Sequence, residues 1–193
     1  MLQNLDKYEI ILASNSPRRK ELLQRLGIPF KVRTLLGIDE SYPENLKGDE
    51  IVKYISKKKA EAYRSTMLDN ELIITADTIV MLGDEVLGKP HSEEDAIDVL
   101  RKLSGHTHQV MTGIMVQTVD RMEGMAVTTD VTFTNLLEED IEYYVKSFLP
   151  YDKAGGYGIQ EWIGMIAVEN IRGSYWNVMG LPVHQLYKML LTF

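Results

Sequence analysis

Cysteine is absent from all 193 residues of the chain. This absence excludes disulfides, thiolate zinc sites and cysteine nucleophiles. Long apolar runs are also missing, since no stretch approaches the roughly 20 residues that a membrane span needs. The first nine residues contain acidic side chains and no long apolar run. We therefore expect no signal peptide, no membrane segment and a cytoplasmic location.

Positive charge is in deficit, with 21 Lys and Arg against 28 Asp and Glu and a formal net charge of −7. This balance argues against broad electrostatic binding to nucleic acid or anionic membranes. A polyanionic substrate would need a local basic site instead. The sequence also lacks a Walker P-loop, a Gly-x-Gly-x-x-Gly fingerprint and a Gly-x-Ser-x-Gly nucleophile elbow.

The hydrophobic and charged fractions, 45% and 25%, are ordinary for a globular protein. The length fits one domain over residues 1–193, either simple or with two lobes around a cleft. Apolar and polar patterning alternates between strands and helices, which predicts an α/β fold with a mixed sheet. The predicted strands are 10–13, 28–36, 72–82, 86–87, 107–118, 126–135 and 163–168. The predicted helices are 17–26, 49–67, 92–103, 138–148 and one that begins at residue 182.

The first candidate site is the turn from Ser14 to Arg19, where a strand leads into a helix. Ser16 is suited to the N-cap and Pro17 to the first helical position. Free backbone N–H groups at such a helix start favour an anion. The Ser14 hydroxyl and the guanidinium groups of Arg18 and Arg19 would add donors for phosphate oxygens. An ordinary capped helix start with two solvated arginines is the alternative interpretation.

Asp77 is the second candidate, because it interrupts a strand that is apolar on both faces. A buried carboxylate is costly unless it binds something or does chemistry. It could hold a metal ion or activate a water molecule, or it could simply cap backbone N–H groups. Glu40, in the acidic pair Asp39-Glu40 after a predicted strand, could supply a second metal ligand or start a loop.

Lysines and a glycine-rich loop complete the candidates. Lys89 lies in the constrained Gly88-Lys89-Pro90 turn, and Lys59 is one of three adjacent lysines that cannot share one helical face. The segment 153–160 contains three glycines, which let the backbone approach a ligand closely or act as a flexible connector. Gln160 at its end could hydrogen-bond the edge of uracil or thymine, but its amide could also flip to meet cytosine.

Six segments, taken in order, resemble the Maf family (septum-formation-inhibitor-like nucleotide pyrophosphatases). Each is weak alone, but together they span nearly the whole chain and are very specific. The segments are Ala13–Leu23, Lys59-Ala60, Ala76-Asp77-Thr78, Gly88-Lys89-Pro90, Asp152–Gln160 and Gly173–Pro182. The last two resemble the branch that hydrolyses dTTP and UTP. Asn15 and Trp176 are mild departures from the family pattern.

The resemblance implies an α/β fold with a twisted mixed sheet and two lobes around a nucleotide cleft, related to the inosine-triphosphate pyrophosphatases. It implies hydrolysis of a nucleoside triphosphate, dTTP or UTP or a modified pyrimidine nucleotide, to the monophosphate and pyrophosphate with Mg²⁺ or Mn²⁺. The resemblance implies that Ser14, Arg18 and Arg19 bind phosphates and that Lys59 and Lys89 offset charge on the leaving group. It implies that Asp77 activates water and that Asp77 and Glu40 hold the metal. Thr78 and Gln160 would help to select the base.

Two rival classes remain open at this point. A nucleotide-binding regulator of cell division would use the arginines and the glycine-rich loop, but it would not need Asp77 inside an apolar strand. A binder of nucleic acid fits poorly with the acidic balance. A homodimer is compatible with the sequence, which does not determine the oligomeric state, the preferred nucleotide or the metal.

Overall fold

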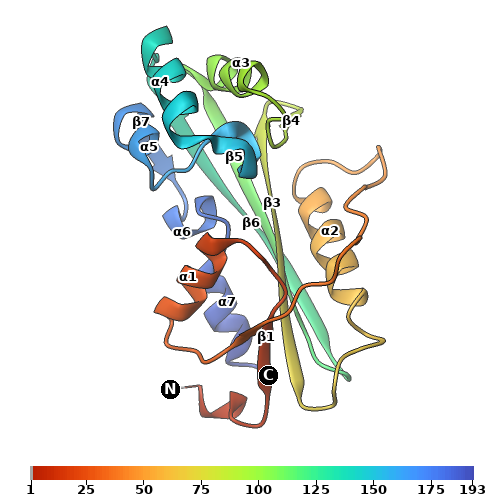
Figure 1. Cartoon of the computed structure of the whole chain (residues 1–193). Helices are drawn as coiled ribbons and strands as arrows, with labels where there is room; N and C mark the ends of the chain where they lie inside the picture. Colours follow the sequence, from red (N-terminus) through yellow and green to blue (C-terminus); the bar gives the residue numbers. More distant parts are fainter. Residues whose placement is uncertain (1) are drawn as a thin grey trace. The chain divides into compact units, whose positions relative to one another are not determined.

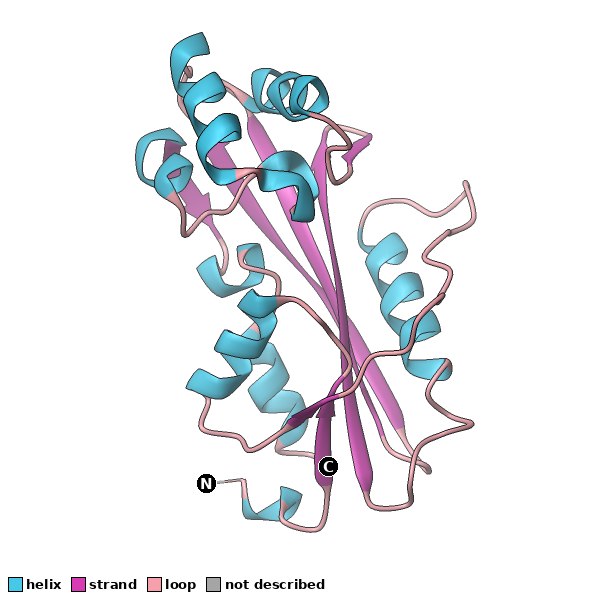
Figure 2. Ribbon diagram, viewed as in Figure 1, coloured by secondary structure: helices cyan, strands magenta, loops and turns pink. Residues whose placement is uncertain are grey.

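A computed structural model describes residues 2–193 as an α/β protein (Figures 1 and 2). The strands are β1 Glu9–Leu12, β2 Lys31–Val32, β3 Glu71–Leu82, β4 Glu85–Leu87, β5 Thr107–Gln117, β6 Met122–Phe133 and β7 Val168–Arg172. The α-helices are α1 Pro17–Arg25, α2 Asp49–Glu61, α3 Glu93–Leu103, α4 Glu138–Phe148, α5 Trp162–Ala167, α6 Tyr175–Val178 and α7 Val183–Leu190. Short 3₁₀ turns lie at Gln3–Leu5, Pro150–Asp152 and Ala154–Gly156.

The seven strands form one mixed sheet in the order β2-β1-β3-β5-β6-β7, with β4 paired to β3. Strand β1 runs parallel to β2 and to β3, whereas β4 and β7 run antiparallel to β3 and β6. The predicted mixed sheet is therefore confirmed.

The chain divides into two compact units, and β3, β5 and β6 contribute residues to both. Unit 1 consists of residues 1–77, 112–127 and 180–193, of which the structure describes all but the first. Unit 2 consists of residues 78–111 and 128–179.

In unit 1, helix α2 packs closely on the strands. The Thr75 hydroxyl of β3 donates to the Ser56 carbonyl at 2.7 Å. A Cβ on Gly113 of β5 would lie 2.3 Å from the Val52 carbonyl oxygen, so only glycine fits there without displacing the helix. Figure 1 shows α2 on one side of the strands of this unit, and α1 and α7 on the other.

Helix α1 begins and ends as its sequence predicts. The Ser16 side chain accepts a hydrogen bond from the Arg19 amide, and Pro17 occupies the first helical position. Gly27 follows the helix with a φ of 69°, a left-handed conformation that glycine adopts without steric cost.

In unit 2, helices α3 and α4 pack against each other, and an aromatic cluster lies in the core. The rings of His108, Phe133 and Tyr157 meet edge to face, with centroids 4.9 to 5.4 Å apart. His108 Nε2 is hydrogen-bonded to the Tyr157 hydroxyl at 2.8 Å, and all three side chains are buried. Burial lowers the pKa of His108 from 6.5 to about 4, so the ring is neutral near pH 7.

We expect His108 to make the protein less stable in mild acid. At pH 5 the unfolded chain binds a proton on this ring and the folded chain does not, so stability is lost as the pH falls from 6.5 towards 4. The loss at pH 5 should be about 2 kcal/mol. His108→Gln, which keeps a hydrogen-bonding group but does not titrate, should show a smaller fall in urea unfolding free energy between pH 7.5 and pH 5. His106→Gln, at an exposed ring, is the control; equal pH slopes for all three proteins would contradict the assignment.

The predicted strand at 163–168 is wrong. Residues Trp162–Ala167 form helix α5, and the strand β7 begins only at Val168. Ile163 and Ala167 are fully buried, whereas Met165 between them is 78% exposed. This spacing of four residues is helical. A short apolar run in a sequence is compatible with both helix and strand periodicity, so the sequence alone did not distinguish them.

Two other predicted elements are shorter than expected. Of the predicted strand 28–36, only Lys31–Val32 pairs with β1, as an exposed edge strand. The predicted helix 49–67 ends at Glu61. Beyond it, tight turns lead to the buried Tyr63, whose hydroxyl donates to the Arg33 carbonyl at 2.9 Å. The chain thus leaves the helix where Tyr63 anchors it to the segment that follows β2.

Candidate functional site

The turn from Ser14 to Arg19 has the structure of a helix start with a buried serine beneath it. The Ser14 hydroxyl accepts hydrogen bonds from the Ser16 amide at 3.2 Å and from Nη1 of Arg19 at 3.4 Å. Its own proton is therefore the group that it can still donate to a ligand. The first N–H groups of α1 add the partial positive charge of a helix N-terminus.

Arg19 has a structural role within the protein in addition to its expected role in phosphate binding. Its Nε donates to the Gly180 carbonyl at 2.8 Å, which holds the segment before α7 against α1. Burial lowers the pKa of its guanidinium, the Asp77 and Glu40 carboxylates raise it, and Arg18 lowers it further. All four of these residues belong to unit 1.

Asp77, Lys59 and Glu40 form a cluster. The Lys59 ammonium lies 2.7 Å from Oδ1 of Asp77 and 2.8 Å from Oε1 of Glu40. The Lys59 and Asp77 side chains are 14% and 13% exposed, whereas the Glu40 side chain is 55% exposed. Two acids that are 37 residues apart in the sequence thus meet at one cation, with Asp77 near the end of the β1–β3 ladder at Ile74.

The three adjacent lysines diverge, as helix geometry predicts. Lys57 pairs with Glu61 at 3.7 Å and Lys58 with Asp39 at 2.7 Å, so Lys59 is the one that reaches Asp77. The neighbouring acids also have different partners, since Asp39 pairs with Lys58 and Glu40 pairs with Lys59.

In unit 2, the glycine-rich loop lies against the Gly88-Lys89-Pro90 turn. The Gly155 amide donates to the Gly88 carbonyl at 3.0 Å. Gly155 has a φ of 70°, and a Cβ there would lie 2.8 Å from the Val80 side chain. Both conditions require glycine, so this part of the loop is a fitted structure and not a flexible connector.

A family model described as "Maf-like protein" matches residues 9–193. The chain belongs to the Maf-like family. This confirms the membership that the six sequence segments predict.

Curated relatives are similar to this chain over nearly their full length. A protein of Phocaeicola vulgatus named dTTP/UTP pyrophosphatase is 60% identical over 190 residues, which are 98% of each chain. A protein of Bacteroides thetaiotaomicron with the same name is 57% identical over 187 residues, 97% of each chain. A solved HAM1 protein from Coxiella burnetii, 13% identical with a TM-score of 0.50, matches 96% of this chain and 100% of its own. At that identity it supports the α/β fold alone.

Gln160, the predicted reader of the base, has an unmet hydrogen-bonding group. Its Oε1 is buried and has no hydrogen-bond partner among residues 2–193. Buried polar atoms almost always have partners, and the Oε1 atoms of Gln117 and Gln185 are likewise buried and unmatched among the described residues.

The structure also identifies residues that the sequence analysis missed. The buried hydroxyl of Tyr144 and the carboxylate of Glu161 hold the end of the glycine-rich loop. Glu161 directly follows the loop, which was a possible signal. Tyr144 is one tyrosine among ten and offered none.

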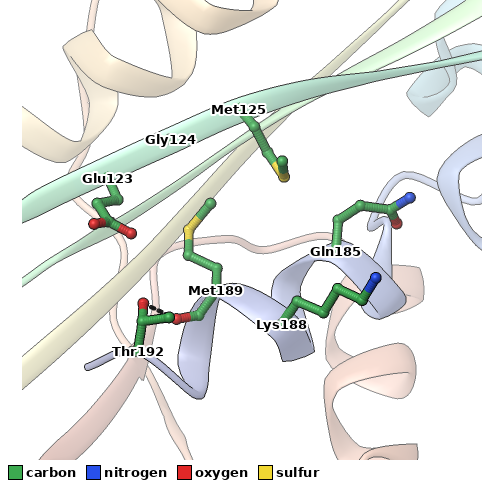
Figure 3. Close-up of a pocket in the computed structure, with 7 residues that line it drawn as sticks. All are labelled: Glu123, Gly124, Met125, Gln185, Lys188, Met189 and Thr192. Atoms are coloured by element: carbon green, nitrogen blue, oxygen red, sulfur yellow. Dashed lines mark hydrogen bonds between the residues drawn. The ribbon is translucent and has the colours of Figure 1, made fainter.

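A cavity of about 500 Å³ in unit 1 contains none of the predicted site residues (Figure 3). Side chains of β6 line one side, and those of α7 with Thr192 line the other. The lining residues are Glu123, Gly124, Met125, Gln185, Lys188, Met189 and Thr192.

Residues 2–193 contain no group of three or more His, Asp or Glu side chains arranged to hold a metal ion. Asp77 and Glu40, the two metal ligands expected from the sequence, both contact the Lys59 ammonium. No helix in the described part of the chain is long and apolar enough to cross a membrane.

Proposed function

We propose that this chain is a nucleoside triphosphate pyrophosphatase that hydrolyses dTTP and UTP to the monophosphate and pyrophosphate. The names of the relatives at 60% and 57% identity support this substrate class. The observation that carries the chemistry is the Asp77–Lys59–Glu40 cluster. A poorly exposed carboxylate held against an ammonium suits water activation beside a polyanion.

Phosphate binding falls to the start of α1. The Arg18 guanidinium and the Ser14 hydroxyl present donors that match phosphate oxygens, and the N-terminus of α1 adds partial positive charge. Arg19 contributes positive charge there, although its Nε already holds the Gly180 carbonyl. This local basic group reconciles a polyanionic substrate with a chain of net charge −7.

The reaction is attack of water on the α-phosphorus. Asp77 accepts the water proton, a new phosphorus–oxygen bond forms, and the bond from the α-phosphorus to the bridging oxygen breaks. Pyrophosphate leaves with that oxygen, and the ammonium groups of Lys59 and Lys89 offset its growing charge. Lys59 has two tasks, since it also orients Asp77 at 2.7 Å.

A divalent cation, Mg²⁺ or Mn²⁺, fits the same acids. Asp77 and Glu40 converge on one cationic group, the Lys59 ammonium, and carboxylate oxygens are the ligands that these ions prefer. Mg²⁺ is commonly bound through one or two carboxylates together with substrate phosphates, so two protein ligands suffice. When bound, the ion would neutralise phosphate charge.

We assign selection of the base to Gln160, assisted by Thr78. The unmatched Oε1 of Gln160 is an acceptor, and uracil and thymine offer an N3–H donor where cytosine has an acceptor. Gln160→Ala should lower the ratio of kcat/KM for UTP over CTP by about tenfold, because one discriminating hydrogen bond is lost. The control is Gln24→Ala at an exposed position on α1. An unchanged substrate ranking in Gln160→Ala would remove it from base reading.

The decisive test of the proposed function is a panel of natural and modified nucleoside triphosphates with Mg²⁺ or Mn²⁺. We expect pyrophosphate from dTTP and UTP ahead of the purine nucleotides. Release of orthophosphate in its place would reject pyrophosphatase chemistry. Binding of nucleotides without any release would favour the regulator of cell division.

We also propose that the enzyme works in the cytoplasm. A homodimer stays a prediction, and light scattering on the purified chain would measure the oligomeric state.

A further inference from the structure

Gln160 is presented by a tight turn at the end of the glycine-rich loop. The Glu161 amide donates to the Gly158 carbonyl at 2.9 Å, which closes a four-residue turn with Ile159 and Gln160 at its two central positions. The direction of the Gln160 side chain therefore depends on how firmly the two ends of this turn are held.

One hydroxyl holds both ends. The Gly158 amide donates to the Tyr144 hydroxyl at 3.0 Å, and the same hydroxyl donates to the Glu161 carboxylate in a short hydrogen bond. Tyr144 lies in α4 and is fully buried. Its pKa is raised, first by burial and then by the bond to Glu161, so the hydroxyl keeps the proton that it donates.

Neighbouring groups fit around this arrangement. The Lys153 ammonium, at the start of the loop, lies 3.2 Å from the other oxygen of Glu161. A Cβ on Gly158 would lie 2.7 Å from the Glu161 carboxyl carbon, and a Cβ on Gly164 would lie 1.8 Å from the Ile159 carbonyl oxygen. The turn is thus packed against α5 on one side and tied to α4 on the other, with little freedom left to Gln160.

We propose that Tyr144 is a positioning residue that determines substrate specificity. Its hydroxyl holds both ends of the Gly158–Glu161 turn by hydrogen bonds and so fixes Gln160 against the base of the substrate. This inference rests on the proposed function. Tyr144 acts through the turn, because its hydroxyl is already fully engaged with Gly158 and Glu161.

The test removes one oxygen atom. Tyr144→Phe keeps the ring and its stacking on Phe148, whose centroid lies 5.0 Å away, so the variant should fold. Tyr143→Phe is the matched control, because Tyr143 is the preceding residue of the same helix and is 53% exposed. Both variants and the unaltered chain would be assayed for KM and kcat with UTP and CTP, and for amide hydrogen exchange over residues 153–161.

In Tyr144→Phe we expect KM for UTP to rise about tenfold and the UTP-over-CTP ratio of kcat/KM to fall about tenfold, with kcat changed far less. The Gly158 amide should also exchange faster, because its acceptor is gone. Tyr143→Phe should match the unaltered chain in every measurement.

The possible failures are distinguishable. If the unaltered chain hydrolyses UTP and Tyr144→Phe keeps its KM and base ranking, the positioning role is wrong and the proposed function stands. A loss of thermal stability with unchanged selectivity would likewise reduce Tyr144 to a structural residue. If the unaltered chain hydrolyses no nucleotide, the proposed function itself fails, and the role of Tyr144 fails with it.

Discussion

Replacing Asp77 with asparagine is expected to lower kcat by about 10³-fold while leaving the fold intact. Asparagine has the same shape, and its carbonyl oxygen can still accept a hydrogen bond from Lys59, which lies 2.7 Å from Oδ1 in the native protein. It cannot accept a proton from water at neutral pH. The measurement is pyrophosphate release from dTTP and UTP, with circular dichroism to verify the fold.

Asp39→Asn is the matched control for this variant. Asp39 lies beside Glu40, makes an ion pair with Lys58 at 2.7 Å and has an exposed side chain. Its pKa is lowered chiefly by the hydrogen bond from Lys58 and further by Ser41, which are surface contacts of modest energetic value. Near-normal turnover in Asp77→Asn, or an equal loss in Asp39→Asn, would remove Asp77 from its role as the base.

Replacing Arg33 with methionine should destabilise the protein by about 3 kcal/mol. Glu71, at the start of β3, is buried, and its two carboxylate oxygens accept hydrogen bonds from Arg33 at 2.6 and 2.8 Å. The Leu68 amide adds a third bond at 2.9 Å. Without Arg33 the buried carboxylate loses its counter-charge, although methionine keeps much of the apolar stem. Urea unfolding at pH 7.5 measures the difference.

The control is Arg25→Met, which removes an exposed ion pair with Glu21 on α1 and should change stability by less than about 0.5 kcal/mol. The pH dependence gives a second check. The Arg33 hydrogen bonds lower the pKa of Glu71, so their stabilisation is present above pH 4.5 and is lost as the pH falls. The penalty in Arg33→Met should therefore shrink in acid. A penalty that stays constant from pH 7.5 to pH 4 would mean that lost packing, and not the unpaired carboxylate, causes it.

Much of the phosphate-binding half of the candidate site could be predicted from the sequence, because its signals are local. A serine N-cap followed by proline fixes the start of α1 within four residues, and the structure has that start. The family resemblance paired Asp77 with Glu40 as metal ligands, but the contact of both acids with the Lys59 ammonium was not predicted. Lys59 and Glu40 are 18 and 37 residues away from Asp77, and no local pattern encodes such a contact.

The error at residues 163–168 has a related cause. Ile, Met, Ala and Val can face a core with either strand or helix spacing. The sequence therefore indicated a buried apolar element at this position but did not show whether it was a strand or a helix. In the structure, Ile163 and Ala167 of α5 face the core at helical spacing, and Gly164 allows the helix to approach the Ile159 carbonyl. Tyr144 was missed because its role depends on Gly158 and Glu161 far along the chain.

The sequence by itself determined the α/β class, the N-cap of α1, and membership of the Maf-like family. These depend on local backbone preferences and on motifs read in order. Only the tertiary structure decided which lysine of three meets Asp77, that Arg19 holds Gly180, and that one buried hydroxyl fixes the turn carrying Gln160. Each of these is a contact between distant segments, and burial gives it its strength by excluding the water that would otherwise compete.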